Sequence, residues 1–184
     1  MKKLMIAALI VCAAALSQAA CIDWSVPNSA WTVPSGAKPA SGTLVYLING
    51  DTALDTVAAA VAAGNVTEQS WFYGSAATDN TKGRIPENKV SSANLANNTF
   101  YNFSALMVDG DKYMVSKAAN QMAYKDGEEA MAVSFSSGLL GANAQTAALS
   151  GAVNGWATAA VPEPTSAMLL VLGVAGLALK RKRA

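Results

Sequence analysis

The sequence predicts an α+β or mainly β domain, in which a small antiparallel or mixed sheet carries one alanine-rich helix, flanked by an apolar segment at each end. Three observations support this fold class. Short runs of β-branched and aromatic residues alternate with turn residues. One internal segment, residues 53–63, has the length and composition of a helix. Two apolar runs, residues 4–16 and 166–179, lie at the ends beside basic residues.

The first half of the domain predicts a strand followed by a helix. Residues 20–41 form an irregular or short-strand entry, and the β-branched and aromatic run at 42–49 predicts an interior strand. Thr52 and Asp55 are spaced like a capping box before the helix over 53–63, and a glycine at position 64 fits its end. The order strand then helix leaves one βαβ crossover open as an alternative.

The second half predicts mainly strands. Residues 71–73 read as a short strand and 79–87 as a loop, because glycine and proline interrupt the loop segment. Residues 99–108 and 112–117 predict a hairpin around Asp109-Gly110-Asp111, with one apolar and one mixed face on the first strand.

A last strand and a polar segment complete the predicted domain. Residues 130–136 predict a strand with Met131, Val133 and Phe135 on one face. Residues 138–160 are rich in alanine, glycine, asparagine and serine, which favours a loop and a short helix leading into a stalk.

The N-terminus has the three-part layout of a secretory signal peptide. Two lysines precede the apolar run at 4–16, which is shorter than the roughly 20 residues of a spanning helix. Small residues at Ser17 and Ala19 predict cleavage between Ala19 and Ala20. A lipoprotein signal cut before Cys21 is an alternative, although position 18 is then glutamine where an apolar residue is usual.

The C-terminus predicts a short single membrane-spanning helix. The fourteen uncharged residues at 166–179 give roughly 21 Å of helix, and snorkelling and local thinning cover the deficit against a hydrocarbon core of about 30 Å. By the positive-inside rule, the basic cluster after the run stays in the cytoplasm and the body lies outside. This cluster consists of Lys180, Arg181, Lys182 and Arg183.

A proline-rich tripeptide, Pro162-Glu163-Pro164, precedes this run, and its two prolines stiffen an extended segment just outside the bilayer. Tripeptide, span and basic end together resemble the PEP-CTERM sorting domain over residues 161–184. The resemblance implies an exported substrate of an exosortase, a membrane-embedded cysteine protease, with Pro162, Glu163 and Pro164 as the recognition element. It implies sorting and says nothing about the activity of the body.

These features predict four parts. They are a signal peptide (1–19), an exported domain (20–140), an Ala/Gly/Asn-rich linker (141–160) and a sorting and anchor segment (161–184). The expected partners are the Sec machinery with signal peptidase, the exosortase-type protease and membrane lipid, with extracellular polysaccharide left open. The expected location is the cell envelope, as a single-pass protein with its body outside; release to the surface or extracellular matrix after processing is left open.

The composition excludes several kinds of chemistry. Without histidine the chain cannot form a Ser-His-Asp triad, a Cys-His pair or a histidine-ligated zinc site. Glycine-rich phosphate loops are absent from the sequence. Residues 20–160 hold seven basic and eleven acidic residues, and this net charge of −4 argues against a nucleic-acid partner. We therefore expect a non-enzymatic protein without a cofactor or metal.

Two alternatives rest on acidic side chains. A carboxylate pair could hydrolyse glycosides, but nothing marks a pair, and Asp126, Glu128 and Glu129 fit a solvated turn. Asp109 and Asp111, with Asp126, could bind calcium, although hairpin chemistry explains the Asp-Gly turn without a metal and the further oxygen ligands of a calcium loop are absent.

A third alternative is a carbohydrate-binding module with exposed tryptophans. It needs an open aromatic platform, whereas core packing is the more common role of such side chains. The candidate residues are Trp24, Trp31, Trp71, Phe72, Tyr73 and Trp156.

The signal-peptide reading predicts that the mature chain begins at Ala20. Intact-mass measurement on the exported protein checks this. A mass that includes residues 1–19 contradicts the prediction, and a lipid-modified start at Cys21 supports the lipoprotein alternative.

Overall fold

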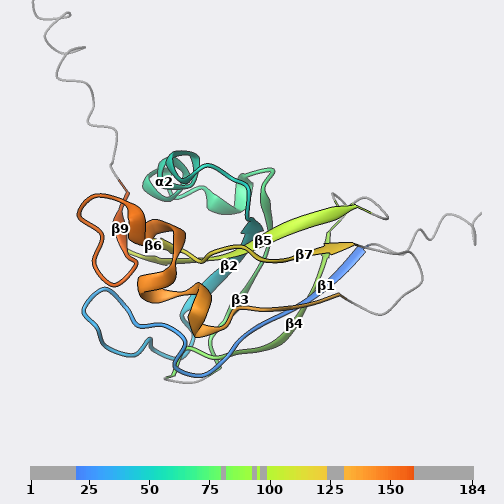
Figure 1. Ribbon diagram of the computed structural model, residues 1–184, viewed down its shortest axis with the longest axis horizontal. Helices are drawn as coiled ribbons and strands as arrows, with labels where there is room; N and C mark the ends of the chain where they lie inside the picture. The colour runs from blue at the N-terminus through green and yellow to red at the C-terminus, as the bar shows by residue number, and fades with distance from the viewer. Residues whose placement is uncertain (1–19, 80–81, 93–94, 96–98, 124–130, 160–184) are drawn as a thin grey trace, which may run out of the picture.

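The computed structural model describes residues 20–79, 82–92, 95, 99–123 and 131–159. It is mostly β, with two sheets and one α-helix arranged in three layers (Figure 1). The small sheet has the order β4-β1-β8, and the large sheet the order β3-β2-β5-β6-β9, with β7 also paired to β5. The small sheet consists of β1 (Ala20–Val26), β4 (Ile85–Ser92) and β8 (Met131–Ser134). The large sheet consists of β2 (Leu44–Asn49), β3 (Phe72–Ala77), β5 (Phe100–Asp109), β6 (Lys112–Val115), β7 (Ala119–Ala123) and β9 (Ala157–Thr158).

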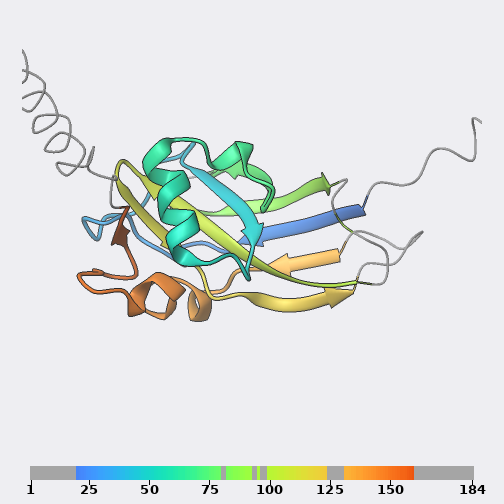
Figure 2. The same ribbon diagram turned by 90° about the horizontal axis from the view of Figure 1, so that it is seen from above.

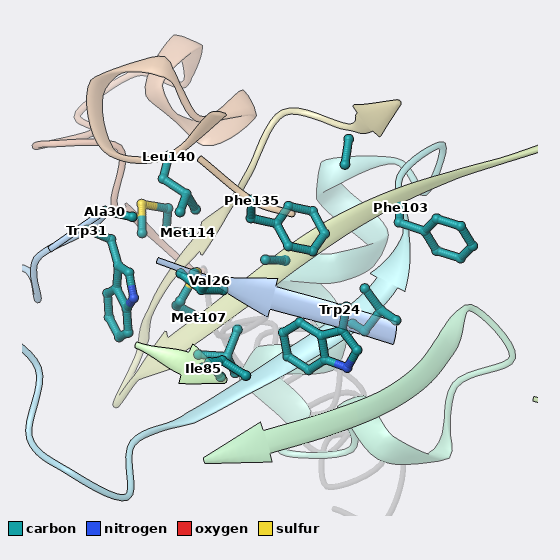
Figure 3. Close-up of a cluster of buried hydrophobic side chains, with 14 of the residues drawn as sticks. Trp24, Val26, Ala30, Trp31, Ile85, Phe103, Met107, Met114, Phe135 and Leu140 are labelled. Atoms are coloured by element: carbon teal, nitrogen blue, oxygen red, sulfur yellow. The ribbon is translucent and has the colours of Figure 1, made fainter. Parts of the chain in front are cut away.

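The two sheets enclose the larger core (Figure 3). Alternate residues of each strand point to opposite faces, so Trp24 and Val26 of β1 meet Met107 of β5 between the sheets. The Trp24 ring packs edge-on against Phe135, 6.3 Å between centroids. This core also contains Ile22, Ala30, Trp31, Val45, Leu47, Ile85, Phe103, Ala105, Met114, Ala119, Val133, Leu140, Ala144 and Trp156.

The other face of the large sheet is covered by helix α2 (Leu54–Ala63), as Figure 2 shows from above. Val57 and Val61 of the helix pack against Leu106 of β5 in a second core. Gly64 ends the helix at φ 68°, as predicted. The predicted capping box is wrong, because Ala53 is the N-cap residue and caps with no side chain.

The hairpin prediction is confirmed: β5 and β6 pair from Leu106 to Val115 around a two-residue turn, in which Gly110 has φ 61°. The 42–49 strand is interior, as expected. The βαβ alternative is wrong, because β2 and β3 on either side of the helix are antiparallel. The parallel pair is instead β1 with β8.

The predicted loop over 79–87 is wrong at its end. Strand β4 begins at Ile85 and includes Pro86. A proline is tolerated there because β4 is an edge strand of the small sheet and its register with β1 shifts between Ile85 and Asn88.

The segment predicted as a linker, residues 141–160, is packed onto the body as far as Ala159. It contains two 3-10 helices, η3 (Gly141–Asn143) and η4 (Gln145–Ala148), followed by β9. A third, η2 (Ser137–Leu139), leads into it. Short apolar side chains and glycines make this packing possible without helix or strand periodicity.

Among the residues described, no helix is long and apolar enough to cross a membrane. The predicted signal peptide and membrane segment lie outside those residues.

The close approach of Gly155 to Gly141 predicts a strong cost for adding a methyl group. A Cβ at Gly155 would overlap the Gly141 carbonyl, and the residue has φ 84°. We expect Gly155→Ala to lower the free energy of unfolding by about 2–5 kcal/mol, from overpacking and backbone strain together. Urea unfolding of the detergent-solubilised chain measures this.

Gly151→Ala is the matched control, because Gly151 has a similar φ of 76° but open space around its Cβ. Its cost should be only the about 1–2 kcal/mol of the left-handed conformation. Equal losses for both variants would contradict the packing seen at Gly155.

Candidate functional site at the C-terminal end of the body

Only one residue of the predicted processing and sorting sites, Ala20, lies among those described. It is the first residue of β1, opposite Ser92 of β4, so the predicted cleavage point immediately precedes the strand. The others lie outside the described residues: Ser17, Ala19, Pro162, Glu163, Pro164, Lys180, Arg181, Lys182 and Arg183.

The last described segment is held against the edge of β6. In the β6–β9 ladder, Thr158 lies opposite Lys112 and Ala157 opposite Tyr113. The Ala159 amide donates a hydrogen bond of 2.7 Å to the Asp111 carbonyl. Ala157 and Ala159 are 5% and 2% exposed. The chain is therefore fixed to the body up to the residue before position 160.

Trp156 anchors this segment from the other side. Its indole Nε1 donates to the Thr32 carbonyl at 2.7 Å, and its ring lies 6.2 Å from that of Trp31. Trp31 Nε1 in turn donates to the Gly83 carbonyl at 3.0 Å. Two buried tryptophans thus join the C-terminal segment to two loops that are distant in the sequence.

Helix η4 packs along the same edge of β6, where two of its side chains form hydrogen bonds. The hydroxyl of buried Thr146 accepts from the Val115 amide at 3.1 Å and donates to the Gly155 carbonyl. Gln145 Nε2 donates to the Ser104 hydroxyl at 3.1 Å and to the Ser116 carbonyl at 2.9 Å. These contacts satisfy backbone groups that would otherwise form an open sheet edge.

Two open hollows lie on the described surface. One, of about 350 Å³, is lined by uncharged residues, including Ser29 and Asn154, both with positive φ. The other, of about 540 Å³, runs along α2, and Asp55 is its one ionisable lining residue. Neither hollow brings two carboxylates together, so neither supports paired-carboxylate chemistry.

Core packing, the favoured interpretation of the aromatic residues, is confirmed for three tryptophans, which leaves the alternative of an exposed platform without them. Trp24, Trp31 and Trp156 are 0%, 3% and 3% exposed, and Trp71 is partly buried. They are core residues, because no other side chain buries as much apolar area between the layers.

The acidic candidates gain no support. Asp109 and Asp111 are exposed at the β5–β6 turn, while Asp126, Glu128 and Glu129 lie outside the described residues. Within the described ranges, no group of three or more His, Cys, Asp or Glu side chains could hold a metal ion.

Two tyrosines have altered acidity. Burial, then Asp55, raises the pKa of Tyr113. Burial, then the neighbouring Tyr101 and Asp51, raises the pKa of Tyr73. Tyr113 therefore stays protonated at neutral pH and its hydroxyl donates to the Leu54 carbonyl at 3.4 Å, which links β6 to the start of α2.

The role of Trp156 was not evident from the sequence, because the composition of its surroundings predicted a linker. The tryptophan itself was the available signal, since so large an apolar side chain is seldom left in a solvated linker.

The described residues end at Ala159, and a proline-rich tripeptide, an uncharged run and a basic cluster follow in the sequence. The family model for the PEP-CTERM protein-sorting motif matches residues 160–183. The chain thus carries this motif, as the resemblance predicted. The motif indicates an exported protein that is processed by exosortase, a membrane protein, and is associated with the cell envelope. Comparisons with curated proteins and with solved structures found no match.

The Thr146 contacts predict a stability loss when its hydroxyl is removed. Thr146→Val keeps the side-chain shape but leaves the Val115 amide and the Gly155 carbonyl without their partner. We expect a loss of about 2–4 kcal/mol in the free energy of unfolding, since each buried group left unsatisfied costs about 1–3 kcal/mol.

The same substitution at exposed Thr158 serves as the control and should change stability by less than about 0.5 kcal/mol. Urea unfolding compares the two variants. A Thr146→Val chain as stable as the original would contradict the stabilising role of the two Thr146 hydrogen bonds.

Proposed function

We propose that this chain is an exported, non-enzymatic protein of the cell surface or extracellular matrix, anchored and sorted through its C-terminal signal. Exosortase recognises Pro162-Glu163-Pro164, the apolar run holds the chain in the membrane, and the basic cluster keeps its end in the cytoplasm. The match of the sorting motif over residues 160–183 carries this proposal.

The arrangement of the body supports it. Strand β1 begins at one end of the long axis and β9 lies at the other end (Figures 1 and 2). A chain held by its C-terminal segment would thus extend away from the membrane, with its N-terminus at the far end. The predicted cleavage after Ala19 removes nothing from the first strand, which begins at Ala20.

The proposal of a non-enzymatic body rests on its side chains. The whole chain lacks histidine, and the two hollows described above contain at most one carboxylate each. The four tryptophans belong to the two cores or pack against them. The absence of histidine, the isolated carboxylates and the packed tryptophans fit a body that presents a stable polar surface.

Replacement of all three residues, Pro162, Glu163 and Pro164, by alanine tests the sorting role. In a host that carries the cognate exosortase, we expect the variant to keep its C-terminal segment while the original chain loses it. The reason is that alanine removes both the extended stiffness of the prolines and the carboxylate. Intact mass of the membrane and surface fractions gives the readout.

Alanine at Pro86 and Glu87 is the matched control, because this exposed Pro-Glu pair lies in β4, outside the motif. The control should be processed like the original chain. If the triple variant is processed and located like the original chain, the recognition role of the tripeptide is wrong.

A further inference from the structure

The fold leaves almost no free chain between the body and the sorting motif. Ala159 is buried and hydrogen-bonded to Asp111, and the motif match begins at residue 160. Two residues, at positions 160 and 161, lie between Ala159 and Pro162, so the chain takes three steps from one to the other. Because an extended chain spans at most about 3.6 Å per residue, Pro162 lies within about 11 Å of the body.

This distance is short for a proteolytic site. A protease binds its substrate segment in a cleft, with protein on both sides of the segment. One packed layer of protein is about 10 Å thick, which is nearly the whole distance from Ala159 to Pro162. The β5–β6 turn, with Asp109 and Lys112 exposed, stands beside the point where the chain leaves the body. An enzyme that enclosed Pro162 while β9 is paired would therefore meet the body at this turn.

Strand β9 is the weakest attachment at this end. It has two residues and pairs with β6 at two positions, Lys112 and Tyr113. The side chains that it and the next residue bury are those of Ala157 and Ala159, which remove little apolar area from water. A short terminal strand of this kind belongs to the part of a fold that opens locally at low cost.

The residues just before β9 are attached far more strongly. Trp156 is buried and donates to the Thr32 carbonyl, and Gly155 accepts from Thr146 and fits closely against Gly141. Opening that starts at Ala159 therefore stops at Trp156. Five residues lie between Trp156 and Pro162, and these six steps reach about 21 Å when extended, against about 11 Å from Ala159 with β9 closed.

We propose that β9 is a latch: it detaches from β6 when the sorting motif enters the protease, and Trp156 is the fixed point at which detachment stops. The proposal rests on the exosortase processing proposed above and adds a regulatory step to it. While the latch is closed the chain is fixed to the body at Ala159, and only the open form gives the motif the reach to enter the enzyme. Processing then proceeds at a rate set by the open population.

A spacer tests the latch directly. Six residues, Gly-Ser-Gly-Ser-Gly-Ser, are inserted between positions 159 and 160 of the full-length chain, which is expressed with the cognate exosortase. The spacer supplies the missing reach while β9 stays closed. We expect processing in a pulse-chase experiment to become about fivefold faster, the change that a latch closed by about 1 kcal/mol predicts. The same spacer between Ser35 and Gly36, an exposed turn off this path, should leave the rate unchanged.

A second variant opens the latch without lengthening the chain. Ala157→Asp places a carboxylate at a buried position of β9 and should also raise the rate, whereas Ala59→Asp, at an exposed helix position, should not. In the chain that also carries the spacer, Ala157→Asp should add nothing, because the two changes relieve the same restriction.

Hydrogen exchange on the detergent-solubilised full chain gives a readout without the protease. We expect the Ala159 amide to exchange through local opening while the Trp156 amide, bonded to the Val153 carbonyl, stays protected. Equal protection of both amides, or a spacer variant processed at the original rate, would overturn the latch. The proposed function has a separate test, the alanine variant of Pro162-Glu163-Pro164. If that variant stays unprocessed, failure of the latch leaves the proposed function intact. If that variant is processed, the proposed function itself is overturned.

Discussion

Burial of both faces of the large sheet is the constraint on which the rest of the structure depends. Along β5, Ala105 and Met107 face the small sheet and Leu106 faces α2, and all three are fully buried. A strand with two apolar faces needs a layer on each side, so neither the helix nor the small sheet is dispensable. One outer layer is the alanine-rich helix α2 and the other is the small sheet of short strands. Both are stable only because the large sheet lies between them.

The same constraint explains the polar residues inside the body. Ser104 on β5 and Ser116, which directly follows β6, are fully buried. Burying a hydroxyl is costly unless it is hydrogen-bonded. Ser116 accepts from the Ala105 amide at 2.9 Å, and Ser104 accepts from Gln145 at 3.1 Å. The C-terminal segment that carries Gln145, Thr146 and Trp156 is thus required to complete the sheet. An alanine- and glycine-rich stretch that looks like a stalk is the closing part of the fold.

Local patterns predicted the elements that local chemistry determines. The Asp-Gly turn specified the β5–β6 hairpin, and Gly64 marked the end of α2. Elements that depend on distant partners could be predicted only in part, and the sequence does not decide between irregular chain and a short strand for the entry segment over 20–41. Strand β1 is held by β4 and β8, far away in the sequence, and Pro86 is accepted only because β4 is an edge strand. Core packing of Trp24 and Trp31 was the favoured interpretation, but the second sheet that buries them is not indicated by any local pattern. Of the candidate site, the motif itself was evident from its residues, whereas the short distance between body and motif required β9 and Ala159 to be located.

The central claim is that the C-terminal segment is a sorting signal that a membrane protease reads and removes. The most direct test expresses the unaltered full-length chain in two hosts that differ only in the cognate exosortase, and measures the intact mass of the mature protein in each. The account predicts a mature chain that has lost the segment after Pro162-Glu163-Pro164 in the host with the enzyme, and a retained segment in the host without it. An intact C-terminus in both hosts would contradict the account and leave a protein that is simply anchored.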